Sequence, residues 1–214
     1  MIKKNFGMDI SFLSFREFEY KKVNNDTGIE IVGLLDRSIV DLSIPKKIDG
    51  LQVVSVGESA FEGCKSLASV ALPESVTEIG QNAFDGCESL TSIVIPNGIT
   101  NINVCTFFGC KSLKSVVITQ NVTIIHSGAF FNCISLAFIK LPSSLFEIHE
   151  GAFAYCTSLT SIEIPSHVSY VGRRAFYMCE SLTIYVENEH AKQDKWDSNW
   201  NDSNRPVVWR HRGE

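Results

Sequence analysis

Cysteine recurs in this chain at a fixed interval, which raises the question of what chemistry the thiols serve. Six of the seven cysteines stand 23 residues apart: Cys64, Cys87, Cys110, Cys133, Cys156 and Cys179. Such thiols can form disulfides, bind zinc, or pack as small apolar side chains. Parallel Cβ vectors suit a disulfide poorly, and a straight column does not converge on one metal ion. The spacing therefore predicts a buried column of free cysteines. Cys105 stands outside this column, so we expect it to be partly exposed and the first thiol to react.

Two histidines share a second column of the same period. The column reads Gly57, Gly80, Asn103, His126, His149 and Gly172. Glycine, asparagine and histidine all tolerate a positive φ, so we predict a left-handed corner here rather than a metal site. The chain also lacks the G-x-x-x-x-G-K-[ST], G-x-S-x-G and H-E-x-x-H motifs. These patterns predict a protein that is not an enzyme and holds no cofactor and no metal.

Composition sets further bounds on the function. The net charge of -5 argues against nucleic-acid binding, which needs a basic patch. The 214 residues include no run of eighteen apolar side chains, so we predict no membrane span. Asp9 and Arg16 interrupt the apolar N-terminal stretch, and no signal peptide is identified. Residues 1–17 are interpreted as a leader or a disordered N-terminus.

The 23-residue period extends well beyond cysteine. Phenylalanine recurs at 61, 84, 107, 130, 153 and 176, and leucine recurs at 67, 90, 113, 136, 159 and 182. In the unit "LASVALPESVTEIGQNAFDGCES", Leu67, Val70 and Leu72 indicate a short strand, which Pro73 ends. The Ala-Phe-x-x-Cys segment that starts at Ala83 suits a single helical turn. One unit cannot cover its own inward side chains, so the units must stack into a solenoid with a parallel sheet.

The consensus "IPxxVxxIGxxAFxxCxSL" resembles the repeat of the BspA-like, Treponema-type leucine-rich repeat proteins, over about residues 18–214. The resemblance implies an α/β fold: a right-handed solenoid with a parallel sheet on the concave face and short helical turns on the convex side. It also implies a binding or adhesion role, with a host or cell-surface protein as partner. Family members suggest a secreted or cell-surface location, but the localisation stays open because no signal peptide is identified.

Both ends of the array are expected to be capped, because end coils otherwise expose their core. Residues 18–57 comprise a predicted hairpin, with the turn at "NNDTG", and the start of the first coil. Residues 58–182 hold the repeats, and residues 183–214 form a C-terminal cap. Trp196, Trp200 and Trp209 are interpreted as a lid over the last coil. The alternative is that these tryptophans bind carbohydrate.

The outward side chains of the strands are the candidate binding residues. The predicted partner-binding set on the concave face is Val94, Val117, Phe138, Lys140, Glu163 and Tyr185. An apolar run flanked by polar side chains on a solvated sheet is typical of an interaction site. An unselected solvated face is the alternative interpretation, and a structural or spacer domain is the alternative function. We expect the chain to be a monomer.

Overall fold

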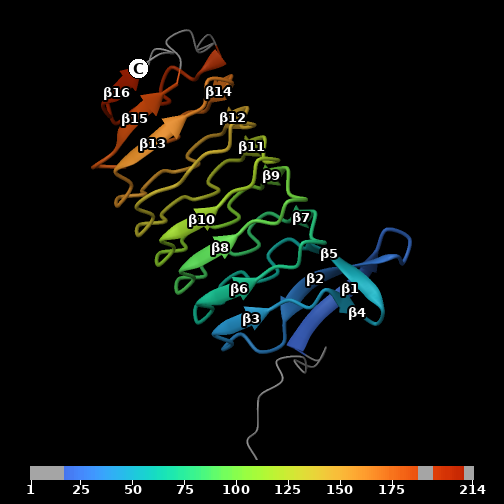
Figure 1. Ribbon diagram of the computed structural model, residues 1–214. Helices are drawn as coiled ribbons and strands as arrows, with labels where there is room; N and C mark the ends of the chain where they lie inside the picture. Colours follow the sequence, from blue (N-terminus) through green and yellow to red (C-terminus); the bar gives the residue numbers. More distant parts are fainter. Residues whose placement is uncertain (1–16, 188–194, 210–214) are drawn as a thin grey trace, which may run out of the picture.

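The computed structural model describes residues 17–187 and 195–209. In Figure 1 the chain rises coil upon coil from an N-terminal hairpin to the C-terminal end, and short strands form two columns along the stack. The described residues contain no α-helix. The structure is therefore a solenoid of stacked strands and turns.

The first column of strands, which we call the front sheet, comes from the L-x-x-V-x-L part of the repeats, with one strand added from residues 207–209. Its members are β3 (Asp41–Ser43), β6 (Ser69–Ala71), β8 (Ser92–Val94), β10 (Ser115–Val117), β13 (Ser161–Ile164), β15 (Thr183–Val186) and β16 (Val207–Trp209). All pairings in this column are parallel. The sheet is divided into β3 to β10 and β13 to β16.

The second column, which we call the side sheet, lies on the right of the stack in Figure 1. Its members are β5 (Leu51–Val56), β7 (Glu78–Ile79), β9 (Asn101–Ile102), β11 (Ile124–Ile125), β12 (Glu147–Ile148) and β14 (Tyr170–Val171). Pairing runs from β5 to β7 and from β9 through β14, and all of it is parallel. The predicted parallel stacking is thus present on two sides of the solenoid, with a break in the front sheet between β10 and β13.

The predicted N-terminal hairpin is confirmed. Strands β1 (Phe18–Val23) and β2 (Gly28–Leu34) are antiparallel, and β2 pairs in parallel with β5. A short strand β4 (Lys47–Ile48) turns back against β5. The hairpin thereby adds two strands to the start of the side sheet. Its capping role stays a prediction, and residues 1–16 lie outside the described residues.

The core is a set of straight columns, as the period predicts. Successive rings of the periodic phenylalanines lie 5.2 to 5.7 Å apart, and all six are buried. The six periodic cysteines are buried beside them, and all seven cysteines are free. Five of these thiols donate to the phenylalanine carbonyl of the preceding coil, at 3.0 to 3.2 Å. The cysteine column is therefore confirmed, and each of these five thiols joins two coils.

The prediction of a helical turn at the Ala-Phe-x-x-Cys segment is wrong. Alternate amides bond within the turn and across coils: the Asp85 N–H donates to the Asn82 C=O (3.0 Å), whereas the Gly86 N–H donates to the Phe108 C=O (2.8 Å). Asn82 and Gly86 also have positive φ angles, of 54° and 68°. Left-handed residues at Asn82 and Gly86 interrupt a right-handed helical turn, so these residues form a series of turns.

The left-handed corner predicted at the glycine and histidine column is also wrong, because no residue of that column has a positive φ. Left-handed residues occur two positions later, at Asn82 (54°) and Cys105 (52°). Where the column holds glycine, as at Gly80, the reason is a close backbone approach instead. A Cβ on Gly80 would lie 2.5 Å from the backbone nitrogen of Glu58 in the preceding coil. Any side chain here would displace the neighbouring backbone.

Candidate binding site on the front sheet

The strand register brings the predicted binding residues onto one face. Val117 pairs with Val94 between β10 and β8, and Tyr185 pairs with Glu163 between β15 and β13. Phe138 forms an isolated parallel bridge with Ser161. The paired residues stand one repeat apart in the sequence, except that Glu163 and Tyr185 are one residue closer because the last strand begins one residue early. This register confirms the columns read from the sequence. Whether the face is concave stays a prediction.

Three of these side chains are large, apolar and exposed. The exposed fractions are 59% for Val94, 55% for Val117 and 61% for Phe138. The intervening residues of each strand, such as Ile93 and Val116, point into the core and are buried. The alternation of a strand therefore places Val94 and Val117 on the solvent side.

A hollow of about 760 Å³ lies on the C-terminal half of the front sheet. Four of the six predicted residues line it: Phe138, Lys140, Glu163 and Tyr185. A volume of this size lies within the range of ligand-binding clefts. Val94 and Val117 do not line the hollow. The structure thus divides the six predicted residues into two groups. Four line the hollow, whereas Val94 and Val117 form an apolar run on the preceding strands.

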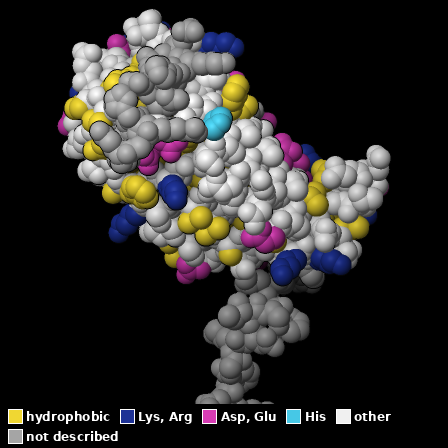
Figure 2. Space-filling model, turned by 45° about the horizontal axis from the view of Figure 1, so that its top comes forward, with side chains coloured by type: hydrophobic (Ala, Val, Ile, Leu, Met, Phe, Trp, Pro, Cys, Tyr) yellow, Lys and Arg dark blue, Asp and Glu magenta, His cyan; other side chains and the backbone are white. Residues whose placement is uncertain are grey.

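The lining of the hollow mixes charged, polar and apolar groups. Lys140 lies there with the carboxylates of Glu163 and Glu187, and the Ser166 N–H donates to Glu187 at 3.0 Å. Buried Ile139 and Ile162 also contribute to the lining, so the hollow reaches toward the core. Acidic and basic side chains are also interspersed over the surface seen in Figure 2. Mixed polar groups around apolar anchors are typical of a surface that recognises a partner.

The coil at residues 136–158 departs from its neighbours on three sides of the solenoid. Phe138 replaces the serine of the other repeats on the front, and Phe146 replaces threonine or serine on the side. Tyr155 replaces the glycine or asparagine of earlier coils at a turn, with a φ of 61°. Its ring lies 5.1 Å from Phe131. The left-handed φ at this turn is shared by every coil, including Met178 of the next one (58°), so only the aromatic ring is particular to this coil.

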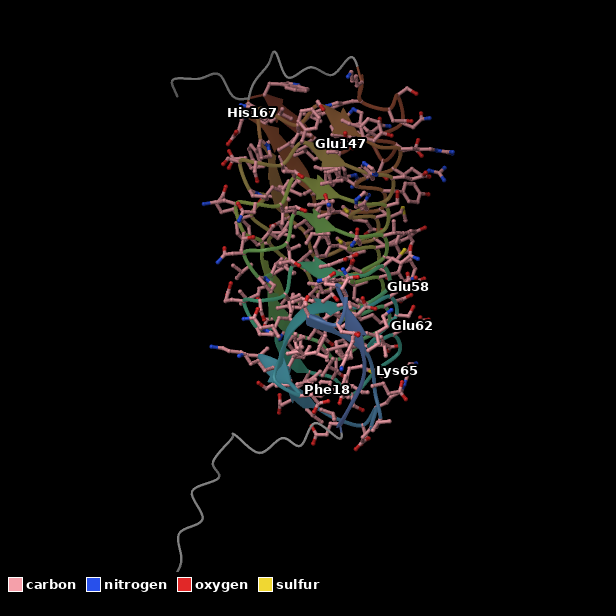
Figure 3. All side chains as sticks on the ribbon, turned by 90° about the vertical axis from the view of Figure 1, so that its right-hand side faces the viewer. Phe18, Glu58, Glu62, Lys65, Glu147 and His167 are labelled. Carbon is pink, nitrogen blue, oxygen red and sulfur yellow. The ribbon has the colours of Figure 1, made fainter. Side chains whose placement is uncertain are left out.

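The two histidines form a small cluster on the side sheet. The rings of His126 and His149 meet edge to face at 4.9 Å, and Nε2 of His149 lies 2.7 Å from Glu147. Burial lowers the pKa of His126. Figure 3 looks onto this side of the molecule, with Glu147 over the strands. In the described part of the chain, no group of three or more histidine, cysteine or acidic side chains is arranged to hold a metal ion.

The three tryptophans pack together beyond the last repeat. Trp196 is buried, with an exposed fraction of 8%, and its ring meets that of Trp200 at 5.0 Å. Trp200 also contacts Phe176, the last ring of the phenylalanine column, at 6.2 Å. The rings contact one another and the end of the phenylalanine column; the lid and the carbohydrate interpretations both stay predictions. Residues 188–194 and 210–214 of the predicted cap lie outside the described residues.

Sequence reasoning missed the hollow and the break in the front sheet beside it. Two departures from the consensus mark the place: Phe138 stands in a serine column, and Thr119 stands where four other repeats have proline. The Thr119 hydroxyl is buried with no hydrogen-bond partner among the described residues. Among residues 17–187 and 195–209, no helix has the length and apolar character needed to span a membrane.

Comparison with known proteins agrees with this architecture. The family model for the BspA type leucine-rich repeat region matches six copies, over residues 36–156 and 77–195. The crystal structure of a T. pallidum leucine-rich repeat protein is similar, with 31% identity and a TM-score of 0.76. That alignment covers 91% of this chain and 97% of the other.

A leucine-rich repeat protein from Bacteroides ovatus shares the fold, with 24% identity and a TM-score of 0.61. The alignment covers 93% of this chain and 71% of the other chain. The comparison with curated proteins finds no match. On the strength of its six repeats and its likeness to the T. pallidum protein, the chain belongs to the BspA-type leucine-rich repeat family.

Proposed function

We propose that this chain is a non-enzymatic protein-binding or adhesion module, and that its contact surface is the front sheet around the hollow. The observation that carries the proposal is the exposure of Val94, Val117 and Phe138 on the same sheet that holds the hollow. Repeat families of this kind serve as interaction modules. The proposed partner is a host or cell-surface protein, and the active species is a monomer.

Phe138 and Tyr185 are the proposed anchors of the interface. Aromatic side chains carry much of the energy of protein interfaces, because they bury a large area at a low entropic cost. Both line the hollow, and Phe138 is the more exposed of the two. Lys140 and Glu163 stand beside them with opposite charge. We assign these two residues to selectivity and association rate rather than to affinity.

The test is a pull-down from host-cell or bacterial-surface extract, followed by affinity measurements on the captured protein. Phe138→Ala and Tyr185→Ala should each weaken binding at least tenfold, about 1.4 kcal/mol. Phe146→Ala is the matched control, since Phe146 is 50% exposed in the same coil but lies beside the side sheet. Lys111→Glu, at a turn, should also have little effect. Loss of binding in either control, with Phe138→Ala unaffected, would contradict the proposal.

A spacer domain is the alternative function, and it makes the opposite prediction. A spacer has no specific partner, so no protein should be captured in a manner that depends on Phe138. The hollow and the exposed phenylalanine favour the binding function, because a spacer needs neither.

A further inference from the structure

Asn97 and Gly98 form the centre of the turn that follows β8, and they are the one Asn-Gly pair in the sequence. The Ile99 N–H donates to the Pro96 C=O at 3.1 Å, which closes this β-turn. Asn97 is exposed to solvent. The turn therefore presents a carboxamide to water, next to a peptide nitrogen whose own residue has no side chain.

The carboxamide of Asn97 is held loosely. Its Nδ2 lies 3.3 Å from Oε2 of Glu74, and the Asn97 backbone nitrogen lies 3.4 Å from the same oxygen. Both distances exceed the usual range of about 2.7–3.2 Å for such a bond. In contrast, Nδ2 of Asn103 donates to the Ile79 C=O at 2.7 Å. The Asn97 side chain can therefore change its rotamer without losing a strong hydrogen bond.

The N–H of Gly98 is equally unconstrained. Among residues 17–187 and 195–209, no group accepts a hydrogen bond from it. Two other repeats have serine at this position, Ser75 and Ser144, whose hydroxyls donate to a C=O of the preceding coil at 2.7 and 2.6 Å. Gly98 lacks this anchor. Without a Cβ it also leaves its nitrogen open to approach and its backbone freer to rotate.

We infer that Asn97 is a modification site, at which the side-chain amide converts to a carboxylate through a cyclic imide. The Gly98 nitrogen gives its proton to solvent and attacks Cγ of Asn97. The N–Cγ bond forms as the Cγ–Nδ2 bond breaks, and Nδ2 takes up a proton and leaves as ammonia. Water then opens the imide at one of its two carbonyls, which gives aspartate or isoaspartate. This site is separate from the proposed binding function.

The modification alters contacts that join three successive coils. The Nδ2 donor near Glu74 is replaced by a carboxylate oxygen, so two negative charges face each other. The Asn97 C=O also accepts a hydrogen bond from Nδ2 of Asn121 in the next coil, at 2.7 Å. In isoaspartate this carbonyl carbon leaves the main chain, so the bond to Asn121 is lost. Ageing of the chain therefore loosens the stack beside β8, which carries Val94.

The first experiment incubates the whole chain in mildly alkaline buffer, which favours loss of the Gly98 proton, and follows the digested chain by mass spectrometry. Asn97 should convert to two products of equal mass, aspartate and isoaspartate. Asn103 and Asn121 are internal controls and should stay amides, because each is held by a hydrogen bond of 2.7 Å. Gly98→Ser restores the serine of other repeats and should slow the conversion roughly tenfold, about 1.4 kcal/mol in barrier height.

Two results would overturn the inference. The first is an Asn97 that stays an amide in the native chain, whether or not it converts in urea, because the folded turn would then protect it. The second is an equal rate in the parent chain and in Gly98→Ser, because neither the open nitrogen nor the missing anchor would then matter.

A second readout tests the effect on the stack. Asn97→Asp should lower the midpoint of urea denaturation at neutral pH, and Glu74→Gln in the same chain should reverse part of that loss. Asn97→Gln keeps the amide and should leave the midpoint unchanged. A midpoint of Asn97→Asp equal to that of the parent chain would overturn the inferred loosening of the coils.

Discussion

Phe153 and Phe146 belong to the same coil and differ only in the direction that they face. Phe153 is fully buried between Phe130 and Phe176, with ring separations of 5.3 and 5.7 Å. Phe146 is 50% exposed, and the other repeats have threonine or serine at its position. The period is therefore kept where a side chain must fit the same side chain of the next coil. It is relaxed where the side chain meets solvent or a partner.

The same contrast holds between the cysteine column and the front of the 136–158 coil. Each periodic cysteine after the first donates to the coil before it, which repeats one contact along the stack. On the front, Phe138 replaces a serine, and strand pairing stops between β10 and β13. Stability thus depends on repetition, whereas the candidate site lies where repetition fails.

The largest expected effect comes from breaking the phenylalanine column. Phe153→Ala should lower the free energy of unfolding by about 3–5 kcal/mol, because it leaves a cavity between two stacked rings. Phe146→Ala is the matched control and should cost less than about 0.5 kcal/mol, as exposed positions do. Urea denaturation of both variants measures the difference. Equal losses would show that the two columns do not differ in packing.

The second prediction concerns the pH dependence of stability. Burial raises the pKa of Cys87 and Cys179 from 9.0 to about 12. Well below pH 9.0 both thiols are neutral whether the chain is folded or not, so their contribution is complete. As the pH rises through the window from 9.0 to about 12, the unfolded chain ionises first, and the free energy of unfolding falls.

Denaturant titrations at several pH values across this window measure that slope. Cys87→Ala should reduce it, because one of the ionising groups is removed. A free energy of unfolding that stays constant in the wild type from pH 9.0 upward would contradict the buried column.

The smallest expected effect separates Cys105 from the column. Its thiol is partly exposed, whereas the other six are buried. Burial also raises the pKa of the Cys105 thiol, so its reaction should be slow at neutral pH and faster in mild alkali. A thiol titration of the native protein should show about one accessible group, lost in Cys105→Ser. Several groups reacting together, or disulfides found by mass spectrometry, would contradict this assignment.

Sequence alone predicted the features that depend on identical neighbours. The buried cysteine and phenylalanine columns, the parallel stacking and the pairing of Val94 with Val117 all follow from one repeated unit placed on another. The N-terminal hairpin followed from its turn residues, from Asn24 to Gly28. In each of these cases the residue pattern is compatible with a single arrangement of the chain.

The sequence predictions failed where one residue pattern is compatible with two different local structures. Ala83, Phe84 and Cys87 face inward in a helical turn and equally in the observed series of turns, so spacing could not separate the two. A glycine at position 80 is compatible with a positive φ and equally with a close approach of two backbones. The structure shows that the close approach is the reason for glycine there. The hollow lies beside the place where strand pairing stops between β10 and β13, and no single repeat encodes that break.

A hydrogen-exchange footprint of the whole chain with its captured partner tests most directly whether the front sheet is the binding surface. We expect slowed exchange to be confined to the front strands and the segment at residues 138–143, with the side sheet and the tryptophan cluster unchanged. Slowed exchange centred on His149 and Tyr170 of the side sheet, or on the tryptophans, with the front strands unaffected, would contradict it.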